Sequence, residues 1–155
     1  MNVRLATEAD LGRVNELRRM VNNVHVAGRP DIFKAGFSRE LQDRIYEIWN
    51  DPEQDIAVAE KDGVICGLAI LHHVTRPENP FMLERDYLDI DEFGVDEAYR
   101  RQGVAAALIA FVREYAAQKG IRRIELNMWE FNESALAFYE AAGFTTYRRY
   151  MEMFL

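Results

Sequence analysis

The stretch Arg100-Arg101-Gln102-Gly103-Val104-Ala105 lies where the sequence changes from a strand pattern to a helix pattern. Gly103 and Ala105 are small, so backbone amides at this turn can approach a bulky anion closely. The amino end of the helix adds a partial positive charge, and the two arginines add fixed cations. The hexapeptide therefore predicts a phosphate-binding turn, although an ordinary strand-to-helix turn with solvated arginines fits these six residues equally well.

Apolar spacing on both sides of the turn predicts a mixed α/β domain. A helix over about Gly103–Lys119 follows the turn, because apolar residues recur there at intervals of three and four. The other expected helices begin at Leu11, after the capping residue Ser38 and at Ser134. The expected strands are Val3–Leu5, Ile56–Glu60, Val64–Thr75, Tyr87–Val95, Ile121–Asn127 and Phe144–Phe154. This order, βααβββαβαβ, is typical of an α/β fold.

The strand before the turn changes the parity of its apolar residues. Leu88 and Ile90 occupy even positions, whereas Phe93 and Val95 occupy odd ones. A regular strand cannot keep both pairs on one face, because its side chains alternate. One extra residue near Asp91-Glu92, a β-bulge, would bring all four side chains to the same face. A strand buried on both faces explains the same pattern.

A second segment, Asn132-Glu133-Ser134-Ala135-Leu136-Ala137-Phe138-Tyr139-Glu140-Ala141-Ala142-Gly143-Phe144, lies downstream. It resembles the Asn-x-x-Ala-x-x-Phe-Tyr-x-x-x-Gly-Phe segment of the GNAT N-acetyltransferase family. The turn at 100–105 is similar to that family's Arg/Gln-x-x-Gly-x-Gly/Ala pyrophosphate loop, with Ala105 in place of the second glycine. The resemblance runs from Tyr87 to Phe144, while from Val3 to Thr75 only the order of elements matches.

The resemblance implies a fold and a coenzyme. The expected fold is a single N-acetyltransferase domain over residues 1–155. Its central twisted sheet is mostly antiparallel, with one splayed parallel strand pair, and about four helices flank it. The expected co-substrate is acetyl-CoA, with its pyrophosphate on the backbone from Arg101 to Ala106 and its pantetheine arm along the strand edge at Phe93 to Val95. The implied coenzyme contacts are Phe93, Gly94, Val95, Arg100, Arg101, Gln102, Gly103, Val104, Ala105, Ala106, Asn132, Ala135 and Tyr139.

Catalytic roles follow from the same resemblance. Tyr139 is the expected proton donor to the leaving thiolate, although an ordinary core tyrosine fits its position on the face shared with two alanines. A base is also needed, because an alkylamine with a pKa near 10.4 is neutral in only about one molecule in 2,500 at pH 7. Asp89, Asp91 and Glu92 form an acidic cluster beside the proposed bulge, and the family places its base at Asp91 or Glu92. A solvated acidic strand edge is the alternative.

The acceptor site is expected near the loop between the first two helices, where His25 and Arg29 are candidate contacts and helix-end packing is the alternative. We expect no metal, because His72 and His73 are neighbours on a strand and point to opposite faces. Cys66, the single cysteine, fits a reducing compartment, and we expect a cytoplasmic protein without a signal sequence.

Composition limits the classes of molecule that the protein is expected to bind. The net charge of −7 argues against nucleic-acid binding, and the longest apolar run, Val104 to Val112, is far too short for a membrane span. The predicted function is therefore acetyl transfer from acetyl-CoA to a primary amine of a small molecule or peptide, by direct attack in a ternary complex. Two alternatives stay open: a non-catalytic acyl-CoA sensor, and an acyltransferase with another acyl donor. A C-terminal strand rich in Tyr and Met suggests a possible homodimer.

Overall fold

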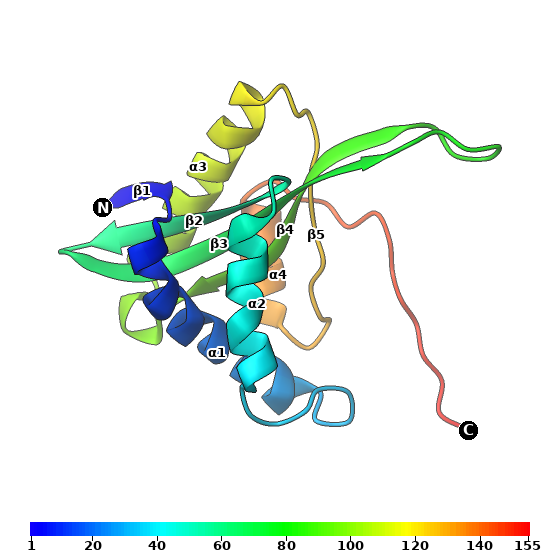
Figure 1. Cartoon of the computed structure of the whole chain (residues 1–155). Coiled ribbons are helices and arrows are strands. Elements are labelled where there is room, and N and C mark those ends of the chain that lie inside the picture. The colour runs from blue at the N-terminus through cyan, green and yellow to red at the C-terminus, as the bar shows by residue number, and fades with distance from the viewer.

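The computed structural model describes all residues from 1 to 155 and forms one five-stranded sheet with helices on both faces (Figure 1). Its strands are β1 (Asn2–Leu5), β2 (Gln54–Lys61), β3 (Val64–Arg76), β4 (Arg85–Val95) and β5 (Ile124–Leu126). Its helices are α1 (Leu11–Gly28), α2 (Arg39–Asn50), α3 (Val104–Gln118) and α4 (Glu133–Ala141), with short 3-10 turns at Glu8–Asp10 and Glu97–Tyr99. The strands lie in sequence order, antiparallel except for the parallel pair β4–β5.

Alternation along the central strands builds two cores, one on each face of the sheet. Ile56 and Val58 of β2 pack with the buried residues of α1 and α2, whereas Ala57 and Ala59 pack with those of α3. Helix α4 joins the α3 side through Phe138. The mixed α/β class, the mostly antiparallel sheet and the four flanking helices expected from the sequence are confirmed.

The predicted bulge in β4 is present. Leu71 of β3 lies opposite Ile90, but the preceding residue Ile70 lies opposite Glu92, so Asp91 has no partner in the ladder. The extra residue returns Phe93 to the α3 side, where Leu88 and Ile90 also pack. The parity change in the sequence therefore comes from a bulge and not from a strand with two apolar faces.

The parallel strands separate at this bulge. Strand β5 pairs with β4 only from Leu88 to Ile90, and β4 then continues along β3 as far as Val95 without a partner on its other edge. The expected strand Ile121–Asn127 is shorter than predicted at both ends, because only Ile124–Leu126 pair with β4.

The strand expected at Phe144–Phe154 is wrong. Beyond α4 the chain runs as an extended coil away from the body of the molecule (Figure 1). Residues 145–155 make no backbone–backbone hydrogen bond, and the side chains of Tyr150, Met151 and Phe154 are exposed. Strand-forming residues need a neighbouring strand, and none in this chain lies beside them.

No helix of the structure is both long and apolar enough to cross a lipid bilayer.

Candidate functional site

The turn before α3 is lined with free backbone amides. The amides from Arg101 to Ala106 donate to no protein acceptor, and no side chain caps the helix. Gly103 has a φ of +82°, in the left-handed region that favours glycine, and Arg101 has a φ of +59°. A left-handed non-glycine residue costs about 1–2 kcal/mol, so this turn holds a strained backbone. Free amides at a helix amino end form a site for an anion such as a phosphate.

Charged side chains flank this turn. Arg100 lies 3.4 Å from Glu97 in an exposed ion pair, while Arg101 is exposed and makes no ion pair. The Gln102 side chain is held in place, because it accepts from Lys61 Nζ at 2.6 Å and donates to the Ala98 carbonyl at 2.9 Å. The predicted residues of the turn therefore lie together, with the amides and one free guanidinium available to a ligand.

The unpaired edge of β4 leads from this turn toward α4. Phe93 lies on the α3–α4 side of β4, with its ring 6.0 Å from the rings of both Phe138 and Tyr139. Gly94 lies on the other side, where a Cβ atom would come within 2.5 Å of Val21 in α1. Any side chain at Gly94 would therefore push α1 away from the sheet.

Tyr139 combines burial with a free hydroxyl group. Its ring packs among Phe93, Phe138 and Phe144, and burial raises its pKa to about 12. The hydroxyl makes no hydrogen bond with protein groups, yet it is not sealed in the core. Tyr139 thus keeps its proton at neutral pH, and its ring lies against Phe93 of β4.

Asn132 begins α4. Its side-chain oxygen accepts from the Ala135 amide at 3.2 Å and from the Ser134 hydroxyl at 3.2 Å. This cap fixes the start of the helix that carries Tyr139. The amide nitrogen of the side chain makes no hydrogen bond with the protein and so has donors free for a ligand.

The three carboxylates near the bulge differ in their surroundings. Both oxygens of Glu92 accept from the guanidinium of Arg18, at 2.9 to 3.1 Å. Arg18 is buried in α1 and also donates to Asn15 and to the Leu41 carbonyl, which links α1, α2 and β4. Asp91, the bulge residue, is exposed to solvent. Glu92 is therefore committed to an ion pair, whereas Asp91 is free.

Asp89 lies deeper in the protein than exposed Asp91. Its side chain is half-buried and accepts no hydrogen bond from the protein. Burial, and next the negative charge of Asp91, raise the pKa of Asp89 to about 6. The bulge at Asp91 shifts the alternation of side chains by one residue. Asp89 therefore faces the same side of the sheet as Glu92, whereas Ile90 faces the other side. A half-buried carboxylate with a raised pKa is a stronger base than an exposed one and is still ionised at pH 7.

Aromatic side chains gather at the carboxyl end of α1. The ring of His25 stacks on Phe33 at 5.2 Å, and Phe33 meets the edge of Trp129 at 5.2 Å. Burial lowers the pKa of His25, so its ring is neutral at pH 7. The guanidinium of Arg29 lies 5.7 Å from the Trp129 ring and forms ion pairs with Asp31 and Glu152. Both predicted acceptor residues thus belong to one cluster, which joins α1 to the segment after β5.

Sequence reasoning missed Arg18, Phe33 as a partner of Trp129, and the distinct character of Asp89. Of these, only Arg18 could have been found from the sequence. It is a charged residue on the face of α1 that Val14 and Leu17 bury, and a buried charge needs a partner. Trp129 and Phe33 are distant in sequence, and nothing in either segment indicates their contact.

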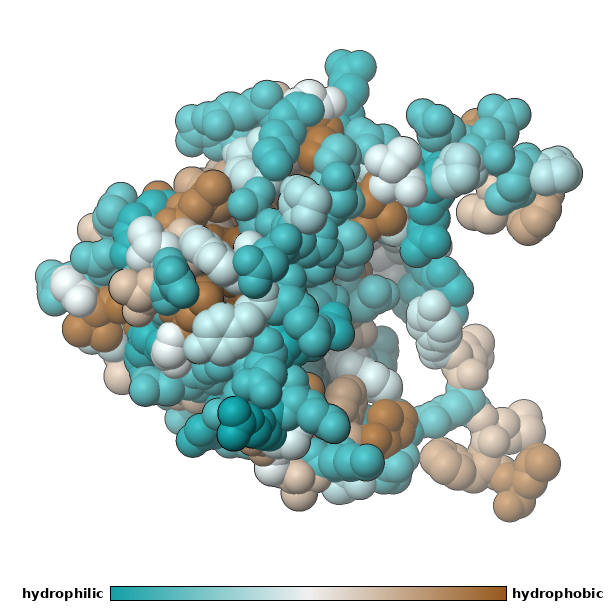
Figure 2. All heavy atoms as spheres, viewed as in Figure 1, coloured by the Kyte–Doolittle hydropathy of each residue, from teal (hydrophilic) through white to brown (hydrophobic).

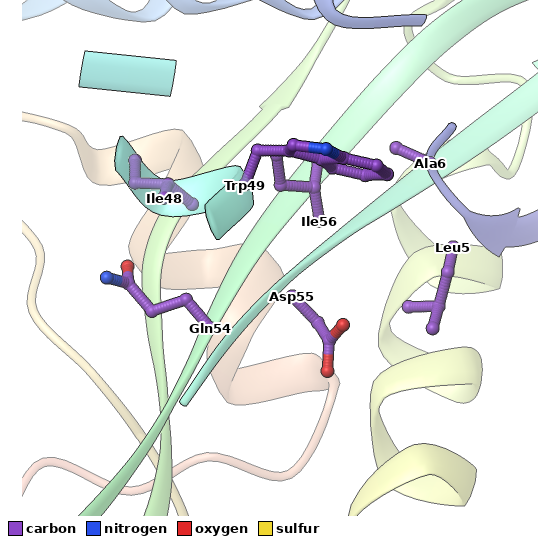
Figure 3. Close-up of a pocket in the computed structure, with 7 residues that line it drawn as sticks. All are labelled: Leu5, Ala6, Ile48, Trp49, Gln54, Asp55 and Ile56. Carbon is purple, nitrogen blue, oxygen red and sulfur yellow. The ribbon is translucent and has the colours of Figure 1, made fainter. Parts of the chain in front are cut away.

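Two concave pockets lie away from this site. One, of about 230 Å³, is lined by Leu5, Ala6, Ile48, Trp49, Gln54, Asp55 and Ile56, between the end of α2 and the start of β2 (Figure 3). The other lies beside it, between β1 and α3. Neither contains a residue of the turn, the bulge or α4. The candidate site is therefore formed by the free amides of the turn, the unpaired edge of β4 and the titratable groups near the bulge, outside both pockets.

The chain is similar in sequence and in fold to known proteins of one family. A model of the acetyltransferase (GNAT) family matches residues 21–144. The BH1408 protein from Bacillus halodurans is 28% identical, with a TM-score of 0.94 over the full length of both chains. AAC(6')-Iy, solved with a bisubstrate analogue containing CoA, is 19% identical with a TM-score of 0.78 over 99% of this chain and 97% of its own, a likeness of fold alone.

Among curated relatives, the L-ornithine N5-acetyltransferase NATA1 of Arabidopsis thaliana is 26% identical over 102 residues. That match covers 64% of this chain and 43% of the plant protein. The chain thus spans less than half of this relative's length.

The buried ion pair between Arg18 and Glu92 should be required for stability. Arg18→Met leaves Glu92 half-buried without its cation, and we expect a loss of about 3 kcal/mol in the free energy of unfolding, at the low end for a broken buried pair. Urea denaturation measures the loss. Arg19→Met, which removes the exposed neighbouring charge, is the matched control and should change stability little. Equal stability of the two variants would contradict a structural role for the pair.

Proposed function

Because this chain belongs to the acetyltransferase (GNAT) family, we propose that it transfers an acetyl group from acetyl-CoA to a primary amine. The observation that carries the proposal is the run of free amides from Arg101 to Ala106, which opens onto the unpaired edge of β4. A pyrophosphate needs several donors and a cationic neighbour, and this turn provides both in Arg101 and the start of α3.

The coenzyme contacts follow the path of the unpaired groups. The amides of the turn hold the pyrophosphate, with Arg100 and Arg101 beside it. The free edge of β4 at Phe93 to Val95 pairs with the amides of the pantetheine arm, as an added strand would. Asn132, which caps α4, and Ala135 in the first turn of that helix border the thiol end of the coenzyme. Acetyl-CoA supplies the activated acyl group.

Proton transfer is divided between the two sides of the sheet. Tyr139, on the α4 side, gives a proton to the departing thiolate. On the opposite side the acceptor must lose a proton before it attacks, and a carboxylate of the bulge cluster takes it. The ion pair of Glu92 with Arg18 favours Asp89 for this role, with exposed Asp91 as the second candidate and Glu92 as the third. Asp89 carries a raised pKa and has no competing partner.

The acceptor is proposed to enter beside the aromatic cluster at the end of α1. His25 and Arg29, with Phe33 and Trp129, border this entrance. The acidic groups of β4 suit an amine that arrives as an ammonium ion.

A thiol-release assay over primary amine classes tests the function. Cys66 is buried and burial raises the pKa of its thiol, so this cysteine adds little background. Coenzyme binding without thiol release from any amine would favour the sensor alternative.

Coenzyme affinity should depend on Gly103. Valine strongly disfavours a φ of +82°, and its branched side chain would project into the open side of the turn, where no protein atom lies within 4 Å of a Cβ. We expect Gly103→Val to raise the dissociation constant of CoA at least tenfold, which corresponds to about 1.4 kcal/mol. Calorimetric titration measures it. Gly63→Val is the matched control, because Gly63 has a φ of +78° and open space but lies in the β2–β3 turn. Unchanged affinity in Gly103→Val would remove the phosphate site.

Tyr139 should affect the rate and not the binding of the coenzyme. Loss of a general acid typically lowers the rate by roughly 10²–10⁴-fold, so Tyr139→Phe should lower kcat by that factor with little change in CoA affinity. Steady-state kinetics with the identified amine measures kcat. Tyr115→Phe removes a hydroxyl that bonds Asp55 on the far side of α3, and it should leave kcat nearly unchanged. Full activity of Tyr139→Phe, with chemistry limiting the rate, would return Tyr139 to the core.

The pH profile should distinguish Asp89 from Asp91. If Asp89 accepts the proton, activity requires its ionised form, so kcat/KM should rise as pH passes through about 6. Asp89→Asn should remove this limb and lower the plateau by roughly 10²-fold or more. Asp91→Asn, the same change two residues away, should keep the limb and shift its midpoint to lower pH, because the charge of Asp91 helps to raise the pKa of Asp89. A limb that persists in Asp89→Asn would exclude this residue as the base.

A further inference from the structure

Lys61, the last residue of β2, reaches the turn before α3 from a distant part of the chain. Its ammonium group donates to the Gln102 side chain at 2.6 Å and forms no ion pair with a carboxylate. Gln102 in turn donates to the Ala98 carbonyl at 2.9 Å. A hydrogen bond with one charged partner is roughly twice as strong as a neutral one. The side chain of Gln102 therefore joins the turn to the β2–β3 hairpin.

Two features of the strands bring the hairpin close to the turn. The residues between β2 and β3, Asp62 and Gly63, both have positive φ angles, +52° and +78°, which makes a tight turn and fixes Lys61 at the end of the hairpin. In β3, a Cβ atom on Gly67 would come within 2.8 Å of Val104, so the missing side chain lets the start of α3 lie directly on the strand. Figure 1 shows the tip of the hairpin and the loop before α3 together on the left of the molecule.

The turn has few other contacts that fix its shape. Arg101 and Gly103, on either side of Gln102, have φ angles of +59° and +82°. Neither Arg101 nor Gln102 makes a backbone–backbone hydrogen bond, and Arg100 pairs only with Glu97 of the same loop. A strained backbone persists only where its surroundings hold it. Gln102 is the residue of the turn whose side chain provides such a contact with another segment.

We propose that Lys61 is a positioning residue for the coenzyme, which acts through Gln102 to hold the turn in the conformation that exposes its free amides. The inference rests on the proposed function and deepens it, because the ligand of the turn is taken to be the pyrophosphate of CoA. Lys61 does not need to touch the coenzyme in this role.

The other end of the loop has an anchor of its own. Asp96, at its start, forms an ion pair with Arg13 of α1, and the Asp96 backbone amide donates to the Cys66 carbonyl at 2.9 Å. Arg13 also donates to the Ile65 carbonyl at 3.0 Å. Loss of the Lys61 side chain therefore frees only the Gln102 end of the loop, and the fold should be preserved.

The link lies at the surface, which limits its strength. Gln102 is exposed and Lys61 is half-buried. Figure 2 shows the left end of the molecule, where the hairpin lies, open to solvent with hydrophilic and apolar residues mixed. Because water competes for both groups, we expect loss of the link to weaken CoA binding roughly threefold to fivefold, less than Gly103→Val does. Gly63→Val, in the same hairpin, can at most break this link, so its effect should not exceed this range.

Calorimetric titration of CoA into Lys61→Met, Gln102→Leu and the double variant tests the proposal. Each single variant should raise the dissociation constant by the stated factor. The double variant should raise it no further than the larger single effect, because both changes break the same link. Lys61→Arg keeps a donor and should stay close to the wild type. Lys119→Met is the matched control, because it removes the same charge at the opposite end of α3 and should leave CoA affinity unchanged.

Two further readouts separate positioning from a general loss of structure. In the free protein, the NMR signals of the amides from Arg101 to Ala106 should shift in Lys61→Met, while circular dichroism and urea unfolding stay as in the wild type. In steady-state kinetics with an accepted amine, the KM for acetyl-CoA should rise at unchanged kcat, because a weaker hold on the phosphate end affects ground state and transition state alike.

Equal CoA affinity of the wild type and Lys61→Met would overturn the inference and leave the proposed function intact. An effect of Lys61→Met that persists in the Gln102→Leu background, or that shrinks as the salt concentration rises, would also overturn it, because either result indicates a direct charge contact with a phosphate. A wild-type chain that binds no CoA would overturn the proposed function together with the inference.

Discussion

The single extra residue in β4, Asp91, determines how the rest of the site is arranged. Before it, β4 is bonded on both edges, to β3 and to β5; after it, only β3 remains. A strand that loses a neighbour keeps its amides and carbonyls, so the second half of β4 becomes a row of unpaired groups, where we propose that the coenzyme pairs. The same bulge turns Phe93 toward α4 and Tyr139 and leaves Glu92 facing α1. Without the bulge, the proposed coenzyme edge and the proposed acid–base groups would not lie close together.

The position of α1 depends in turn on the Arg18–Glu92 pair. Removing two charges from water costs free energy. Further hydrogen bonds offset part of this cost, because Arg18 also donates to the Asn15 side chain and to the Leu41 carbonyl. Gly94, two residues after Glu92, lets α1 approach because a Cβ there would strike Val21. These contacts fix the line of α1, and its far end then presents His25 and Arg29 beside Trp129. The polar link in the middle of the helix therefore positions the aromatic cluster at its end.

Local chemistry made much of this predictable from sequence. The parity change from Ile90 to Phe93 predicted the bulge because alternation is a strict rule of strands, and the small residues of the turn predicted the free amides before α3. The features that the sequence did not predict depend on contacts between segments far apart in the chain. Nothing near Phe33 indicates Trp129, and no pattern distinguishes Asp89 from Asp91, because their difference is burial. The C-terminal strand failed for another reason: propensity reports what a segment prefers, but a strand forms only where a partner edge exists.

The charge distribution is compatible with the proposal that an ammonium ion and a phosphate-rich coenzyme meet at the bulge. The chain carries a net charge of −7, which attracts an ammonium ion and would repel a coenzyme rich in phosphate. Long-range repulsion is screened within about 8 Å at physiological ionic strength, whereas the free amides and Arg101 act at contact distance. In the function we propose, the acidic groups therefore dominate the approach of the amine, while the end of α3 dominates the binding of the pyrophosphate. The sheet separates the two regions, with α3 and α4 on one face and Asp89 and Glu92 on the other. The bulge, where β4 and β5 part, opens the sheet between these two faces, and we propose that the reacting atoms meet there.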